Sequence, residues 1–167
     1  AALSISWGSC EDHWPPSALT SMNSALANAT AAGVTVFAAS GDSGRYDCYD
    51  STAPASTMYD AVDYPAPDPN VVAVGGTTVL ATGAESAWSD PLPPPGRPWG
   101  SGGGTSSQWA RPSWQATVAP SSAYRMVPDI SSNADARSGP PVYLPNGGWL
   151  SGGGTSVAAP SMAAMFT

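Results

Sequence analysis

The sequence predicts an α/β fold with a mostly parallel β-sheet. Two apolar runs of strand length, at 2–7 and 34–40, enclose a segment whose apolar residues recur every three to four positions. Strand, helix and strand in this order form a βαβ unit, in which the strands are parallel and the crossover is right-handed. A third apolar run, at 70–80, extends the same sheet. The 167 residues are enough for one domain with a hydrophobic core.

The first half of the chain supplies the βαβ unit. The run ALSISW at 2–7 is expected to be a buried strand that ends at Gly8. The helix, at 17–32, follows two prolines and ends before Gly33, which is a typical helix terminator. The run VTVFAAS at 34–40 is the second buried strand.

The turn SGDSG at 40–44 follows the second strand directly. Ligands of parallel α/β sheets bind beyond the carboxyl ends of the strands. Asp42, in this turn, and Trp7, at the end of the first strand, therefore fall where a functional site is expected.

The second half is richer in loops, because 18 Gly and 18 Pro are unusual for this length. We expect a polar loop at 45–70, a strand at 70–80 that breaks at two glycines, and a loop at 90–104. A short strand follows at 127–131. The segment 81–127 as a whole shows little helical pattern.

The last segment combines a hairpin and a helix. Residues 141–154 contain an Asn-Gly pair between apolar runs, which is typical of a β-hairpin. From Thr155 the sequence TSVAAPSMAAMFT predicts a helix of small residues, with Pro160 in its first turn, where proline is tolerated.

The charge pattern narrows the class of protein. Five arginines and no lysine stand against twelve carboxylates, and a net charge of −7 argues against nucleic-acid or anionic-membrane partners. No apolar run is long enough to span a membrane. Since few carboxylate–cation pairs exist to be lost on acidification, the composition suits a protein that works in acid.

The hexamer SGGGTS occurs twice, and its copies end at Ser106 and Ser156. A helix follows the second copy but not the first. A helix start presents free N–H groups and a positive dipole end, which stabilise an alkoxide and an oxyanion. We therefore expect Ser156 to be a nucleophile and Ser106 to be a loop residue. The alternative is that Ser156 only caps the helix.

A serine nucleophile needs a base. The single histidine, His13, lies in the loop CEDHWPP beside Glu11 and Asp12, and we expect it at the surface. The base is then a carboxylate or a group outside this chain. Cys10 and Cys48 are either free thiols or a disulfide of an exported protein. With His13 they are too few for a structural zinc site, so no metal site is expected in this chain.

The chain resembles the sedolisin family of serine-carboxyl peptidases in six motifs that follow one another in order. These are SISWG, AASGDSG, VDYPAPDPNVVAVGGT, RPSWQ, VPDISSNAD and SGGGTSVAAPSMAA. The resemblance implies a subtilisin-like three-layer fold and an acid-active endopeptidase or tripeptidyl peptidase. It also implies peptide or protein substrates and a secreted, extracellular or lysosome-like location, and we expect a monomer.

The resemblance assigns the catalytic roles. Ser156, in G-T-S, matches the nucleophile, and Asp42, in S-G-D-S-G, matches the aspartate of the oxyanion hole. A protonated carboxylic acid donates a hydrogen bond to an oxyanion, whereas a carboxylate cannot. Taken alone, Asp42 is more typical of a turn residue.

The resemblance also implies substrate-binding residues. Ser6, Trp7 and Gly8 fall on the strand that pairs with an extended peptide, and Asp63 falls near the pocket for the residue before the scissile bond. The alternatives are a core role for Trp7 and a turn role for Asp63.

Two parts of the family pattern are missing from the sequence. The family's base is a Glu with an Asp one helical turn away, upstream of SISWG, and no E-x-x-x-D pair occurs here. The family's calcium site lies downstream of the serine helix. We therefore expect residues 1–167 to be part of a single peptidase catalytic domain, truncated at both ends, without the base or the calcium ligands and with little turnover alone.

Two other functions stay open on the sequence. A subtilisin-type protease that uses a histidine is disfavoured by Asp42 in place of an asparagine and by the lack of an H-G-T-H stretch. A non-catalytic, peptide-binding relative is disfavoured because both Ser156 and Asp42 are present.

Overall fold

The computed structural model describes residues 1–50, 52, 57–90 and 99–167. Its central sheet has the order β1 (Ala2–Ile5), β3 (Thr35–Ala39), β5 (Val72–Val79), and β5 also pairs with β9 (Ile130–Asn133). All of these pairs are parallel. A short strand, β6 (Glu85–Ala87), adds to β5 in the antiparallel sense. The mostly parallel sheet predicted from the apolar runs is confirmed.

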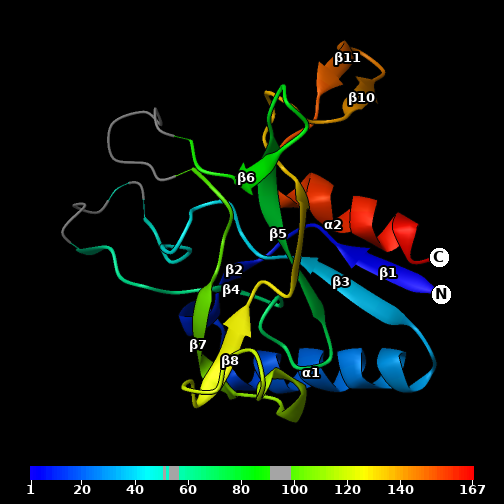
Figure 1. Ribbon diagram of the computed structural model, residues 1–167. Helices are drawn as coiled ribbons and strands as arrows, with labels where there is room; N and C mark the ends of the chain where they lie inside the picture. Colours follow the sequence, from blue (N-terminus) through cyan, green and yellow to red (C-terminus); the bar gives the residue numbers. More distant parts are fainter. Residues whose placement is uncertain (51, 53–56, 91–98) are drawn as a thin grey trace.

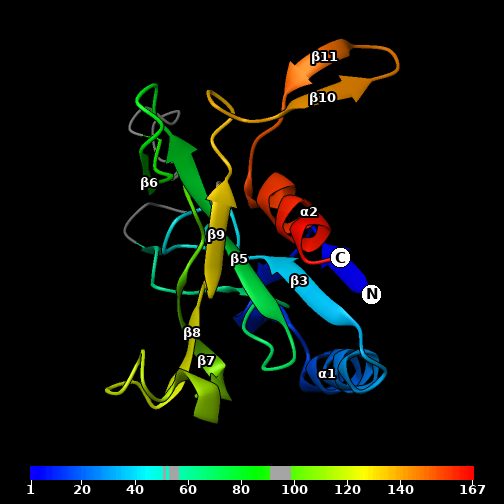
Figure 2. The same ribbon diagram turned by 45° about the vertical axis from the view of Figure 1, so that its right-hand side comes forward.

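Two helices cover opposite faces of this sheet, as Figures 1 and 2 show. Alternate residues of β3 explain the arrangement, because strand side chains point to opposite faces in turn. Val36 and Ala38 pack with Leu26 of α1 (Pro16–Ala31). Phe37 and Ala39 pack with the alanines of α2 (Thr155–Met165). The result is the expected three-layer fold.

The strand β5 is continuous, so the expected break at its two glycines is wrong. Both glycines allow close packing instead. A Cβ on Gly75 would lie 2.6 Å from Cγ of Pro128, and a Cβ on Gly76 would lie 2.6 Å from Cβ of Ala134. These contacts let the sheet approach the neighbouring segments.

Two antiparallel pairs lie where only loops were expected. β2 (Ser9–Cys10) pairs with β4 (Asp63–Tyr64), and β7 (Gly104–Ala110) pairs with β8 (Tyr124–Val127). Short 3₁₀ helices at Glu11–His13 and Ser113–Gln115 accompany them. The part of the expected 90–104 loop at 91–98 lies outside the described residues.

The hairpin at the end of the chain is confirmed. β10 (Pro141–Leu144) and β11 (Gly148–Ser151) pair antiparallel, and they project from the body of the protein in both views (Figures 1 and 2). The large apolar side chains Tyr143 and Trp149 are exposed on it. Across the described chain, no helix has the length and apolar character needed to cross a membrane.

The disulfide alternative for the two cysteines is confirmed. Cys10 and Cys48 are bonded to each other, with Cα atoms 4.6 Å apart. The bond ties the segment after β1 to the loop that follows Asp42.

Candidate active site

A cleft of about 240 Å³ opens at the carboxyl ends of β1 and β3, where the βαβ topology predicts a site. It brings together every site residue expected from the sequence. They are Ser6, Trp7, Gly8, Asp42, Asp63 and Ser156. These residues come from chain segments as much as 150 positions apart, so the fold creates the cluster.

Ser156 lies in the first turn of α2, one residue after Thr155 begins the helix. The N-cap is Gly154, and Ser156 lies inside the helix, so the alternative of Ser156 as a cap is wrong. The Ser156 hydroxyl instead donates to the carbonyl of Ser6 at 2.9 Å. Its backbone N–H belongs to the first-turn donors, which have no carbonyl one turn back.

The helix that carries Ser156 contains a proline, but not in its first turn as expected. Pro160 is the sixth residue of α2 and so lies in the second turn. Because proline has no N–H, the carbonyl of Ser156 loses the donor four residues ahead. The Ser6 hydroxyl takes that place and donates to this carbonyl at 2.8 Å. Pro160 is tolerated because a residue outside the helix satisfies the orphaned carbonyl.

Asp42 is held against the start of the same helix. Its Oδ1 accepts from the Thr155 N–H at 2.7 Å and lies 2.9 Å from the Thr155 hydroxyl. Gly154 makes this approach possible, because it has a φ of 87° and a Cβ there would lie 2.7 Å from Asp42 Oδ2. The alternative of a simple turn aspartate therefore does not describe Asp42. Its carboxyl borders the cleft that holds Ser156.

Two further carboxyl groups lie beside Asp42. Burial, then the charge of Asp42, raises the pKa of Asp63 to about 7. Burial, followed by the charges of Asp63 and Asp42, raises the pKa of Asp47 to about 8. Asp47 Oδ1 accepts from the Ser43 N–H, while Asp47 Oδ2 and Asp63 Oδ1 are buried without a partner. In this carboxyl cluster of Asp42, Asp47 and Asp63, burial favours the protonated forms of Asp47 and Asp63.

Asp47 was not among the expected site residues. It lies in the polar segment after SGDSG, where an aspartate is ordinary and carries no periodic signal. Its packing against Gly41 and Gly102 depends on the tertiary fold, since a Cβ on Gly102 would lie 2.6 Å from Asp47 Oδ2.

The segment after β1 presents backbone and an aromatic ring to the cleft. Trp7 is 53% exposed, so a core role for it is wrong. Its ring stacks on Trp14, with centroids 6.0 Å apart. Gly8 passes close to β4, where a Cβ would lie 2.9 Å from the carbonyl oxygen of Tyr64.

Ser106 is no loop residue, and the expectation that it is one is wrong. It lies in β7 and is 2% exposed. Its hydroxyl donates to Oε2 of Glu11 at 2.7 Å, and the Ser107 N–H donates to Oε1 at 2.6 Å. Glu11 is buried, and this burial raises its pKa. The pair joins β7 to the first 3₁₀ helix and contributes nothing to the cleft.

His13 is exposed, as expected, and it does not line the cleft. A neighbouring cavity of about 470 Å³ shares Gly8 and Asp63 with the cleft, and the disulfide and His13 contribute to its walls. Within the described ranges, only Cys10, Asp12 and Cys48 bring three potential metal-binding atoms together. Both sulfurs are bonded to each other, so this group does not fit a metal.

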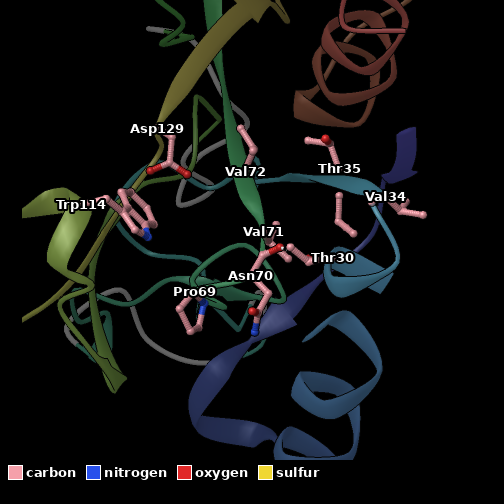
Figure 3. Close-up of a pocket in the computed structure, with 11 residues that line it drawn as sticks. Thr30, Val34, Thr35, Pro69, Asn70, Val71, Val72, Trp114 and Asp129 are labelled. Atoms are coloured by element: carbon pink, nitrogen blue, oxygen red, sulfur yellow. Dashed lines mark hydrogen bonds between the residues drawn. The ribbon is translucent and has the colours of Figure 1, made fainter. Parts of the chain in front are cut away.

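A different cavity, of about 480 Å³, lies at the amino ends of β3 and β5 (Figure 3). Thr35 and Val72 line one part of it, and Trp114 and Asp129 line another. Asp129 already accepts from Arg125 and from the Ala73 N–H. None of the expected site residues lines this cavity; they line the cleft at the other end of the sheet.

The parallel sheet with a helix on each face, and a serine at the start of one of these helices, matches a subtilisin-like architecture. A model of the subtilase family matches residues 2–167. The chain belongs to this family, and its resemblance to the sedolisins is confirmed by the similar proteins.

Kumamolisin from Bacillus sp. (strain MN-32) is 42% identical over 175 residues, which cover 98% of this chain and 30% of kumamolisin. Sedolisin from Pseudomonas sp. (strain 101) is 39% identical over 95% of this chain and 28% of its own length. The chain thus spans less than a third of these relatives. The solved structure of Pseudomonas sedolisin, a serine-carboxyl proteinase complexed with two molecules of pseudo-iodotyrostatin, has a TM-score of 0.85 and 35% identity. That match covers 99% of this chain and 46% of the sedolisin chain.

Proposed function

We propose that this chain is the nucleophile-bearing part of an acid-active serine-carboxyl endopeptidase. The observation that carries the proposal is the position of the Asp42 carboxyl, which is bonded to the helix start that presents Ser156 in one cleft. Residues 1–167 form part of a single catalytic domain in this proposal, and the base comes from a carboxylate outside the chain.

The reaction passes through an acyl-enzyme. Ser156 Oγ attacks the scissile carbonyl carbon while its proton moves to the base. The protonated Asp42 carboxyl and the Ser156 N–H donate hydrogen bonds to the oxyanion. The C–N bond then breaks, and the leaving amine takes a proton. Water attacks the ester carbonyl, gives up a proton to the base and releases the acid, which regenerates the Ser156 hydroxyl.

The carboxyl cluster supports work in acid. Asp42 donates to an oxyanion only when it is protonated. Asp47 and Asp63 are buried beside it, and their raised pKa values show that this part of the protein disfavours negative charge. An oxyanion hole of this kind therefore loses its donor as the pH rises.

The edge formed by Ser6, Trp7 and Gly8 supports binding of an extended peptide. Backbone groups of Ser6 and Gly8 supply strand-type hydrogen bonds, and the Trp7 ring covers the bound chain. Asp63, at the junction with the neighbouring cavity, contacts the side chain before the scissile bond. A secreted or acidic-compartment location, calcium bound outside this chain and a monomeric state complete the proposal.

A histidine-dependent mechanism has less support, because His13 does not line the cleft. A non-catalytic peptide-binding role is the remaining rival. Binding of two ligands to the full-length protein distinguishes the peptidase role from the peptide-binding role. The ligands are a peptide aldehyde and the matching peptide alcohol, and binding is measured at about pH 4, near the ordinary pKa of an aspartate. An aldehyde that forms a hemiacetal with Ser156 binds at least about 100-fold more tightly than the alcohol.

Calorimetry on the wild type and Ser156→Ala measures that difference. The proposal expects the advantage of the aldehyde in the wild type and its loss in the variant, with alcohol binding retained. Equal binding of both ligands to the folded wild-type protein would establish the non-catalytic role instead.

A further inference from the structure

A second cavity, of about 290 Å³, meets the catalytic cleft at Asp42. Trp88 and Trp99 line it together with Arg137 and the backbone of Gly153 and Gly154. The catalytic cleft contains Ser156 and the substrate-pairing edge, whereas the second cavity contains neither. The two cavities therefore lie on different sides of the Asp42 carboxyl.

This placement indicates which part of a substrate the second cavity meets. In the proposed function, the oxyanion lies at Asp42, and the half of the peptide before the scissile bond lies along Ser6–Gly8. The half that leaves must continue away from that edge. The second cavity begins at the same carboxyl and runs along Gly153 and Gly154, directly before the helix that carries Ser156.

We propose that this cavity is a leaving-group subsite that selects a large apolar or aromatic side chain within two residues after the scissile bond. The inference rests on the proposed function and deepens it. We expect the occupant to be a peptide side chain because the cavity shares Asp42 with the peptide cleft, and the chemistry of the occupant follows from the walls.

The walls offer aromatic surface of two kinds. Trp88 is 5% exposed and Trp99 is 43% exposed, and both residues line the cavity. Aromatic pairs gain free energy beyond their buried area. Gly153 packs closely against Ala136, because the Cβ of any other residue at 153 would lie 2.8 Å from Cβ of Ala136.

Two of the charged residues that line the cavity, Arg137 and Asp135, form an ion pair with each other. Arg137 pairs with Asp135, with Nε 2.9 Å from Oδ1 and Nη2 2.6 Å from Oδ2. Asp135 is buried and also accepts from the Thr78 hydroxyl at 2.8 Å. The Arg137 bonds hold the pKa of Asp135 down at about 2, so the pair stays ionised in the acid range where the enzyme is proposed to work.

The test compares peptides that share one acyl half and differ in the two residues after the scissile bond. Full-length wild type is compared with Trp99→Ala, with Trp99→Phe as the conservative variant, and with Trp114→Ala as the control. Trp114 is similarly exposed but lines the cavity at the other end of the sheet. For peptides with an aromatic residue after the scissile bond, we expect kcat/KM to fall about 10- to 100-fold in Trp99→Ala. For peptides with glycine after the scissile bond, we expect kcat/KM to be unchanged. Trp99→Phe restores the preference, and Trp114→Ala changes neither.

A nitrophenyl ester of the same acyl half separates this proposal from the proposed function. Its turnover is unchanged in Trp99→Ala if the cavity binds only the leaving half. A flat leaving-group profile in the wild type, a preference for basic residues, or an equal loss for all substrates would overturn the subsite while leaving the peptidase proposal standing.

A second measurement needs no turnover. The free leaving-half peptide with an aromatic first residue is titrated into the wild type and Trp99→Ala by calorimetry. Binding that weakens about 10-fold or more in the variant supports the subsite. Equal affinity overturns it, whether or not the protein is a peptidase.

Discussion

Ser6 and Ser156 exchange two hydrogen bonds across 150 residues of chain. The Ser156 hydroxyl donates to the Ser6 carbonyl, and the Ser6 hydroxyl donates to the Ser156 carbonyl. The exchange fixes the proposed nucleophile against the proposed substrate-pairing edge. In the proposed mechanism, a peptide that binds along this edge therefore lies beside the Ser156 hydroxyl.

Alanine substitutions of the two serines that end the repeated hexamer are predicted to have different effects on activity and stability. In the full-length protein, Ser156→Ala removes the nucleophile and lowers kcat by at least about 1,000-fold, with the melting temperature nearly unchanged. Ser106→Ala leaves the Oε2 atom of buried Glu11 without the Ser106 donor and lowers the free energy of unfolding by about 1–3 kcal/mol, with kcat nearly unchanged. Initial rates and thermal unfolding of both variants check this. Residual peptidase activity in Ser156→Ala above about a tenth of wild type would refute the assignment.

Asp42 variants are predicted to change the pH dependence of the rate. Asp42→Ala removes an oxyanion donor, which costs about 2.7–4 kcal/mol of transition-state stabilisation, or roughly 100- to 1,000-fold in kcat. Asp42→Asn supplies an amide N–H that donates at any pH, so the loss of activity on the alkaline side moves to higher pH. Rate profiles across the acid and neutral range measure the shift. Identical alkaline limbs in the wild type and Asp42→Asn would show that Asp42 is not the group whose deprotonation matters.

Gly154→Ala is predicted to abolish the alignment of Asp42. The residue has a φ of 87°, and the added Cβ would lie 2.7 Å from Asp42 Oδ2. The matched control is Gly148→Ala, which has a φ of 71° but no heavy atom within 4 Å of the added Cβ. Both variants lose about 1–2 kcal/mol of stability through the left-handed backbone, but only Gly154→Ala loses turnover. Full activity in folded Gly154→Ala would contradict the close approach of Asp42 to the helix start.

Asp47 is predicted to make the folded protein less stable as the pH rises. Its pKa is about 8 in the fold, against an ordinary value of 3.8, because burial and the neighbouring Asp63 and Asp42 penalise its charge. The folded chain therefore holds a proton that the unfolded chain has released between these values. The contribution of the Asp47 carboxyl to the free energy of unfolding is fully present below about pH 4 and decreases as the pH rises to about 8.

Asp47→Asn removes this dependence and raises the free energy of unfolding at about pH 8 by roughly 2–5 kcal/mol, with little change near pH 4. Chemical denaturation at several pH values checks the slope. Asp60→Asn is the control, since Asp60 is exposed and its carboxyl pairs with Arg45, which lowers its pKa. A steeper fall in stability with pH for Asp47→Asn than for the wild type would reverse the sign and refute the cause.

The sheet, both helices and the hairpin could be predicted from the sequence because their signals are local. Apolar runs, helical spacing and an Asn-Gly turn each act within a few residues. The pairing of β7 with β8 had no such signal, because the position of Ser106 depends on Glu11, 95 residues away. One hexamer therefore ends in a strand in its first copy and begins a helix in its second.

The six site residues could be predicted because the motifs that contain them carry the family resemblance. Asp47 and the second cavity could not. The raised pKa of Asp47 results from burial, and the position of Trp99 in the second cavity results from the packing of the segments around Asp42. Neither effect has a pattern along the chain.

Pro160 has a consequence for directed recombination among related proteases. Because the proline deprives the Ser156 carbonyl of its helical donor, the serine helix depends on the Ser6 hydroxyl. A chimaera whose crossover point falls between positions 6 and 160 inherits these two residues from different parents. A chimaera that inherits proline at position 160 therefore also needs a hydrogen-bond donor at position 6, however distant the two positions are along the gene.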